Sequence, residues 1–463
     1  MAKRTLLTIF CLLLLSTFAL TARVSAQGVK PYPHALTDRS IRQETPMPLL
    51  PRNEVFADPD FSSPTHPRLM VRVTDDTTHF IHPGAYLQTE GSGEANEWSA
   101  DSRKFYVVGA GGWDFVFAFD PTTMAISSLP NARPGQGLVL PLRPGPSFSF
   151  VDPDLIYGTS EPDTLTIMSY RFSTGIATPV IDTRTCGVQP ALGSGPSVVS
   201  DDDVSVSLDD RRLSISEGGP QFGKHMFVVA YDKKLGCRWY NTETGQIGGQ
   251  WGTSGTATVT TPYFIRHAYL SRSGNYVFIL VDWFGWYVWN LSTLTVTPCP
   301  NHGNSNECGG YEAVGYNSLV NGPGVKGDMQ VVKRPLSNIS QISQLVWPIP
   351  SDWGLLQHFT WSNVNKLDST PVCASEYGYS DYGWIDRPFA GEILCIETDG
   401  AASTVWRFAH NRATYVSPFF QTQPLGSVSR NGRFFLFTSD WDKQLGNGPD
   451  GTPRSDVFIV KLD

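Results

Sequence analysis

The chain of 463 residues lacks any clear amphipathic helix. Beyond residue 26, no stretch of ten or more residues has apolar side chains at helical spacing. Charged residues are also scarce, at 17%, whereas Gly (43 residues), Pro (34 residues) and aromatic residues (12%) are abundant. Many short strands joined by Gly- and Pro-rich turns produce this composition, so the sequence predicts an all-β protein.

Several chemical motifs are missing as well. No Cys-x-x-Cys pair occurs, which argues against a zinc–thiolate site, and the absence of Gly-x-Ser-x-Gly and His-Glu-x-x-His argues against serine hydrolases and zincins. Basic runs are absent too, in a chain with 35 basic and 43 acidic residues. This balance argues against nucleic acid and anionic membrane surfaces as partners. A strongly anionic ligand would need a local basic pocket.

The one long apolar run lies at the N-terminus. Lys3 and Arg4 precede an apolar stretch from Leu6 to Leu20, and Val24-Ser25-Ala26 offers a small-residue cleavage site. Residues 1–26 are therefore predicted to be a signal peptide, with a retained membrane anchor as the alternative. We expect the mature chain to be secreted or periplasmic, with no membrane span and a net charge of about −11, and to be a monomer.

Six cysteines remain after the predicted cleavage, an even number that suggests disulfides in an exported protein. Sequence proximity favours the pairs Cys299–Cys308, Cys373–Cys395 and Cys186–Cys237. Six cysteines allow fifteen pairings, and unpaired buried thiols remain an alternative for some of them.

A short pattern recurs along the chain: an apolar anchor, a Ser, a tight polar turn and an apolar β run. Its clearest copies start at Trp98, Leu270 and Val428, and weaker copies start at Phe148, Val206 and Trp361. The turn residues supply the left-handed or Asx geometry of a hairpin, and the following run supplies a buried strand. A repeat of this kind indicates one supersecondary unit stacked on its neighbours.

The spacing of the anchors predicts seven units. The first four anchors are 50, 58 and 64 residues apart, and a degenerate copy at Glu312–Asn317, with Gly315 at the anchor position, divides the longest gap into 45 and 46 residues. Each unit is long enough for four strands. We therefore predict that residues 51–463 form one seven-bladed β-propeller with four-stranded antiparallel blades, preceded by a Pro-rich extended leader at 27–50. The segment Leu69–Val73 is expected to pair with the last run, Asp456–Val460, and to close the ring.

Two of these copies carry a family resemblance. Trp98-Ser99-Ala100-Asp101-Ser102-Arg103 and Ser429-Arg430-Asn431-Gly432-Arg433-Phe434 resemble the "WSPDGR" blade repeat of TolB-type and related WD40-like bacterial propellers. The resemblance covers nearly the whole mature chain and is specific for the fold. Such propellers include periplasmic scaffolds, peptidase-associated domains and oligogalacturonate lyases, so the resemblance does not choose between a binding module and an enzyme.

Candidate site residues come from the innermost strands, which line the central channel of a propeller. The positions three residues before the anchors should be equivalent around one channel mouth; they are Ala95, Gly145, Asp203, His267, Glu312, His358 and Leu425. Glu97, Arg266 and Gln357 are their neighbours. Two imidazoles and a carboxylate can bind Mn²⁺ or Zn²⁺, so His267, Glu312 and His358 are candidate metal ligands. Polar residues at such positions are also often only structural hydrogen-bonding groups.

The resemblance to the lyases implies a metal-bound His cluster in which His267 and His358 would take part, although Glu312 stands where a further His is expected. On that hypothesis His267, His358 and Arg266 are the catalytic candidates. The main hypothesis is a non-catalytic exported module that binds a peptide, a protein or a glycan; the alternative is a metal-assisted polysaccharide lyase or hydrolase. We expect His410 simply to end an outer strand, and the aromatic residues between Trp283 and Trp289 to pack within a blade rather than stack on sugars.

Overall fold

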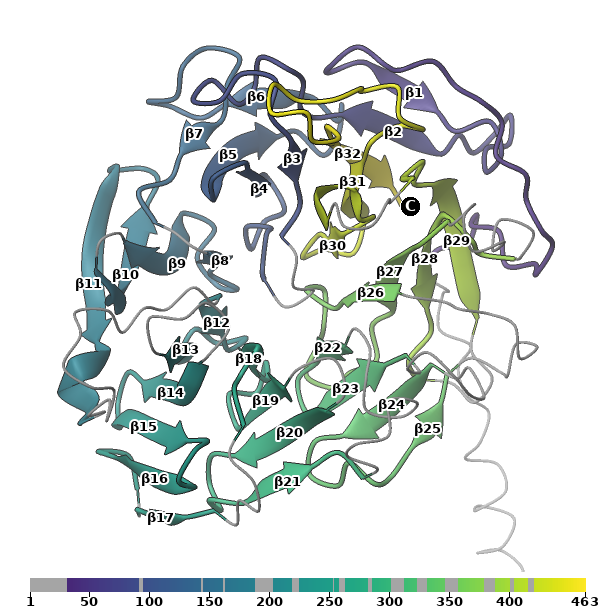
Figure 1. The fold of residues 1–463 in the computed structure, drawn as a ribbon. Coiled ribbons are helices and arrows are strands. Elements are labelled where there is room, and N and C mark those ends of the chain that lie inside the picture. Colours follow the sequence, from purple (N-terminus) through teal and green to yellow (C-terminus); the bar gives the residue numbers. More distant parts are fainter. Residues whose placement is uncertain are drawn as a thin grey trace, which may run out of the picture.

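The computed structural model shows seven antiparallel sheets arranged in a ring (Figure 1). It describes residues 31–90, 95–142, 145–160, 163–187, 203–218, 225–252, 254–257, 263–281, 285–300, 312–322, 331–345, 357–378, 388–399, 404–414 and 420–463. The described part contains strands and two short 3₁₀ turns. The predicted all-β, seven-bladed propeller is therefore confirmed. None of the described helical segments is long and apolar enough to cross a bilayer.

Each sheet is one blade, and its strands lie side by side, ordered from the ring axis outward. Blades 1 to 3 consist of β3 (Leu87–Gln88), β4 (Lys104–Gly109), β5 (Trp113–Phe119), β6 (Ile126–Ser128) and β7 (Leu138–Val139); β8 (Ser147–Phe148), β9 (Leu155–Ser160), β10 (Asp163–Arg171) and β11 (Ile176–Asp182); and β12 (Ser205–Val206), β13 (Arg212–Gly218), β14 (His225–Asp232), β15 (Gly236–Asn241), β16 (Gln246–Gly249) and β17 (Gly255–Thr256). The 3₁₀ turn η1 (Thr183–Cys186) follows β11.

The remaining blades follow the same plan. Blades 4 to 6 consist of β18 (His267–Leu270), β19 (Tyr276–Val281), β20 (Gly285–Asn290) and β21 (Val296–Pro298); β22 (Glu312–Val314), β23 (Ser318–Asn321), β24 (Val332–Pro335) and β25 (Ser343–Gln344); and β26 (Gln357–Thr360), β27 (Val372–Glu376), β28 (Glu392–Ile396) and β29 (Val405–His410). Blade 7 has the order β30 (Gly426–Val428), β31 (Phe434–Ser439), β32 (Asp456–Lys461), β2 (Leu69–Arg72) and β1 (Val55–Ala57), and the 3₁₀ turn η3 (Phe420–Thr422) precedes it.

The repeated turn has the same geometry in four blades. Its fourth residue adopts a positive φ, as Ser102 (58°) and Gly432 (71°) illustrate, and its amide donates to the carbonyl of the repeat Ser. The hydroxyl of that Ser also accepts a hydrogen bond from an amide of the next strand, for example from the Lys104 amide to Ser99 Oγ at 2.9 Å. Residues that tolerate left-handed backbone therefore set the hairpin between the first two strands.

The hydrophobic core lies between neighbouring blades. One cluster joins Trp98 and Phe117 of blade 1 to Phe434 and Ile459 of blade 7, and all four side chains are fully buried. Another joins Tyr240 of blade 3 to blade 4. Because each sheet is covered on both faces by its neighbours, its strands read as short apolar runs rather than strict alternation.

The ring closes through strands from the two ends of the chain. β2 pairs with β32, with Met70 opposite Val460 and Val71 opposite Ile459, as the sequence predicted. The buried Arg72 guanidinium donates to the Asp456 carboxylate, with Nε–Oδ2 at 3.0 Å. The pairing leaves β32 without an open edge.

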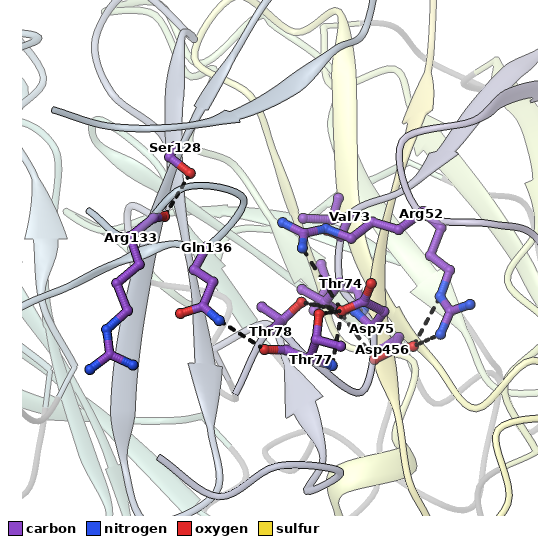
Figure 2. Close-up of polar contacts among 12 residues, drawn as sticks. Arg52, Val73, Thr74, Asp75, Thr77, Thr78, Ser128, Arg133, Gln136 and Asp456 are labelled. Atoms are coloured by element: carbon purple, nitrogen blue, oxygen red, sulfur yellow. Dashed lines mark hydrogen bonds and ion pairs between the residues drawn. The ribbon is translucent and has the colours of Figure 1, made fainter. Parts of the chain in front are cut away.

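The segment 31–66, which we call the strap, runs over blades 6 and 7. Leu36 forms an isolated bridge with Arg407, Tyr32 Oη donates to the Gly432 carbonyl at 2.8 Å, and Trp441 Nε1 donates to the Pro48 carbonyl at 3.2 Å. Figure 2 shows a further contact of the strap, in which Arg52 Nε donates to the Val73 carbonyl at 2.8 Å. The residues of the predicted leader that the structure describes thus pack against the propeller.

Disulfides connect some of these elements. Cys373 and Cys395 link β27 to β28, and Cys186 and Cys237 link η1 to β15 of the next blade, as the sequence favoured. Cys299 is also disulfide-bonded, and its expected partner Cys308 lies outside the described residues.

Candidate functional site

The anchors place the register positions at the inner ends of the blades. Phe148, Val206, Leu270 and Val428 end β8, β12, β18 and β30. Two neighbouring positions are in contact: a Cβ atom built on Gly145 would lie 1.8 Å from Asp203 Oδ1, and the Val204 amide donates to the Gly145 carbonyl at 3.0 Å. Equivalent positions of blades 2 and 3 therefore do meet at the inner edge.

The inner edge near blades 1 to 3 is acidic. Glu97 is buried, its Oε1 accepts the Glu90 amide at 2.6 Å, and burial raises its pKa well above the usual value. Tyr106 is fully buried, and its pKa is raised first by burial and then by Glu90, Glu97 and Asp203. Carboxyl groups from blades 1 and 3 therefore act on one buried phenol.

Blades 4 and 6 contribute a cation and imidazoles. His267 begins β18, is partly buried and lies parallel to the Tyr269 ring at a centroid distance of 5.8 Å. Arg266 precedes it, and the Arg266 amide donates to the Leu280 carbonyl at 2.8 Å. The Arg266 side chain interacts electrostatically with His358, which belongs to a blade two positions further around the ring.

His358 is the most buried of the three candidate metal ligands, with 4% of its surface exposed. Its Nε2 lies 2.6 Å from Tyr377 Oη. Burial lowers the pKa of His358 to about 3; a hydrogen bond with Gln423 opposes that shift, and the Arg266 charge adds to it. The imidazole is therefore neutral at physiological pH.

The three candidate metal ligands all belong to inner strands. Glu312 begins β22 and is buried, between the blades that carry His267 and His358. Within the described residues, however, the three-residue group whose ligand atoms lie within 4.8 Å of one another is Asp58, Asp60 and His410. As placed, His267, Glu312 and His358 do not form a ligand set, so metal binding by these three stays a prediction that requires their side chains to move.

The sequence did not predict the group of Asp58, Asp60 and His410. His410 ends the outer strand β29, as expected, but the side chain also contacts the strap. Asp58 and Asp60 follow β1, outside the blade repeat, and they are about 350 positions from His410 in the chain. No signal in the repeat register could have brought them together.

The aromatic residues of blade 4 are structural where they are described. Trp286 and Trp289 are fully buried, and Tyr287 stacks on Tyr263 at a centroid distance of 4.3 Å. Trp283 and Phe284 lie outside the described residues.

A hollow of about 440 Å³ lies along β9, β10 and β11 on the outer part of blade 2. It contains two basic side chains, but Arg171 pairs with Asp152 and Asp154, and Lys233 Nζ donates to Tyr157 Oη. Because Arg171 is already paired with carboxylates, the hollow is a weaker candidate than the inner edge.

Comparisons with known proteins identify the same architecture. The chain matches no protein-family model and no curated protein. Among solved structures, an oligogalacturonate lyase in complex with manganese is similar, with a TM-score of 0.55, 14% identity and coverage of 92% of this chain and 98% of that chain. An oligogalacturonate lyase from Vibrio parahaemolyticus has a TM-score of 0.52 and 12% identity, with coverage of 89% and 96%. At this identity the likeness establishes a shared fold.

Proposed function

We propose that the protein is an exported propeller that binds a carboxylate-bearing glycan at the inner ends of blades 4 to 6. The observation that carries the proposal is the position of Arg266, whose charge is close enough to the neutral imidazole of His358 to lower its pKa. A guanidinium binds a carboxylate by charge-assisted hydrogen bonds. The imidazole is bonded to the Tyr377 hydroxyl and the Gln423 amide, and the remaining donors and acceptors of these two groups are of the kind that bind sugar hydroxyls.

The inner edge near blades 1 to 3 also favours a ligand whose carboxylate lies at Arg266. The Asp203 carboxylate would repel a carboxylate placed near blades 1 to 3, so the acidic group of a ligand is directed toward Arg266. The net negative charge of the chain also repels long polyanions, because Arg266 offers positive charge at one place only. A short acidic oligosaccharide fits both conditions better than an extended polymer.

A lyase is the second candidate, because the similar solved structures are oligogalacturonate lyases. Such a reaction transfers the C5 proton of a uronate to a base, forms the C4–C5 double bond and breaks the C4–O bond, whose oxygen takes up a proton. A pKa of about 3 makes His358 a poor base for that proton, so a lyase here would use His267. Binding requires no strong base, and for this reason we prefer a binding role over a lyase.

The binding test measures, by calorimetry, the affinity of the mature chain for three ligands. They are a galacturonate trisaccharide, the matching neutral galactose trisaccharide and the members of a peptide library. We expect binding to the acidic sugar alone and a loss of affinity of about 10-fold or more in Arg266→Gln, because a charge-assisted bond contributes about 1.5–3 kcal/mol. Arg171→Gln, on the outer part of blade 2, is the matched control and should bind as the wild type does. Peptide binding without sugar binding, or equal affinity in Arg266→Gln, would overturn the proposal.

The lyase is tested on the same samples by the ultraviolet absorbance of the unsaturated uronate product, with and without added Mn²⁺. Turnover that disappears in His267→Ala would replace the binding role by the enzymatic one. Binding without turnover under both conditions leaves the binding role in place and removes the lyase.

A further inference from the structure

A group of potential metal ligands lies away from the ring axis, where the strap meets the outer strand of blade 6. Asp58 and Asp60 come from the strap, and His410 ends β29. Their ligand atoms all lie within 4.8 Å of one another. The two segments are far apart in sequence, so the fold itself creates this group.

The contacts within the group are close and buried. His410 Nδ1 lies 3.1 Å from Asp60 Oδ2, and only 2% of His410 is exposed. Asp58 has no exposed surface, and its Oδ1 accepts the Asp60 amide at 2.8 Å. Buried acidic groups are normally paired or coordinate a cation.

Asp58 lacks such a pair. Among the described residues no Lys or Arg lies within salt-bridge distance of its carboxylate, and its hydrogen bonds come from the backbone amides of Asp60 and His410. Burial accordingly raises the pKa of Asp58. A fully desolvated carboxylate with amide donors alone is a costly arrangement.

The surroundings are rich in carboxyl groups. Three arginines lie around the group, and they are outnumbered by the carboxylates; the arginines are Arg42, Arg407 and Arg412, and the carboxylates are Asp38, Glu44, Asp58, Asp60, Glu392 and Asp442. Arg407 is engaged by Glu392 and Asp38, and Arg412 by Glu44 and Asp442. Because these arginines are already paired, a divalent cation at the group would supply positive charge next to the carboxylates of Asp58 and Asp60.

The geometry points to a divalent transition cation, Zn²⁺ in the first place, bound by Asp58, Asp60 and His410. One imidazole nitrogen and carboxylate oxygens suit Zn²⁺ or Mn²⁺, whereas Ca²⁺ and Mg²⁺ favour oxygen ligands alone. Two ligands about 2.0–2.1 Å from a tetrahedral ion lie about 3.3 Å apart, close to the Nδ1–Oδ2 distance. The other separations between ligand atoms of the group lie within 4.8 Å. The cation fastens the strap to blade 6, a role independent of any glycan.

The test uses the mature chain, purified without a histidine tag, stripped with a chelator and dialysed against Zn²⁺. We expect one Zn²⁺ per chain by elemental analysis, a rise in melting temperature of a few degrees, and slower proteolysis within the strap. His410→Ala and Asp58→Asn should each lose at least 10-fold in affinity for Zn²⁺. His82→Ala, which removes an exposed imidazole elsewhere, is the control and should retain the ion.

A second readout covers variants that fold poorly. Co²⁺ in place of Zn²⁺ should give visible absorption bands in the wild type that disappear in Asp60→Asn, a change at the partly exposed member of the group. Wild type that retains no Zn²⁺ would overturn the proposal. So would a folded His410→Ala that binds Zn²⁺ as tightly as the wild type, or His82→Ala that loses it to the same extent.

Discussion

At the scale of the residue, Gly145 shows how tightly the inner edge is packed. Its φ is 53°, and a Cβ atom there would meet both Asp203 Oδ1 and, at 2.8 Å, the Asp203 Cα. The side-chain oxygen could turn away, but the backbone atom could not. The absence of a side chain at this register position thus allows blades 2 and 3 to approach each other.

Gly145→Ala should therefore destabilise the protein by about 3 kcal/mol, from backbone strain together with overpacking. Gly112→Ala is the matched control, because its φ is 71° and a Cβ atom would have nothing within 4 Å. It should cost only the strain, about 1 kcal/mol. Urea unfolding measures both, and equal losses would mean that the contact with Asp203 is absent.

At the scale of the element, the strap is held by ionic contacts whose strength depends on pH. Arg412 Nη1 lies 2.8 Å from Glu44 Oε1. Burial, opposed by Arg412 and assisted by Asp442, raises the pKa of Glu44 to about 7. The folded chain therefore holds a proton that the unfolded chain releases near its ordinary value of 4.5.

Stability should consequently fall as the pH rises from about 4.5 to 7, since the folded state binds more protons in that window. In Glu44→Gln this part of the dependence is removed, so the melting temperature should decline less over the same range. Melting curves recorded in chelator measure the two slopes. Glu54→Gln, which removes an exposed carboxylate of the same segment, should follow the wild type; identical slopes in all three proteins would contradict the assignment.

The elements differ in how far the sequence could predict them. The inner strands and their turns follow from local chemistry, because Ser99 and the left-handed Ser102 act within a few residues. The strap has no such pattern: its extended form could be expected from its prolines, but the surface it covers depends on contacts such as that of Tyr32 with Gly432, 400 positions away. The pairing of Asp60 with His410 was hidden for the same reason.

The candidate site was predictable to a similar extent. The register correctly placed His267, Glu312 and His358 on inner strands of successive blades. The register does not fix which way each side chain turns. It therefore could not predict that His358 forms a hydrogen bond with Tyr377, or that the Arg266 charge lowers the pKa of His358. Those features depend on packing between blades rather than on the repeat.

At the scale of the whole molecule, the ring depends on one junction between chain ends. β2 comes from near the N-terminus and pairs with β32 at the C-terminus. Val71 is fully buried in this junction, whereas its partner on the other side, Val55 of β1, is 37% exposed. The two positions lie opposite each other in the same sheet, and they differ in burial.

Val71→Asp should open the closure, because it places an unpaired charge among fully buried side chains, at a cost of about 4 kcal/mol or more. Val55→Asp changes the same residue type on the exposed outer strand and should cost about 0.5 kcal/mol. Thermal melting should separate the two variants clearly. Opening the junction also exposes the edge of β32, so Val71→Asp should self-associate in size-exclusion chromatography while Val55→Asp elutes as the wild type does. If Val71→Asp melts and elutes like the wild type, the pairing of β2 with β32 does not hold the ring together.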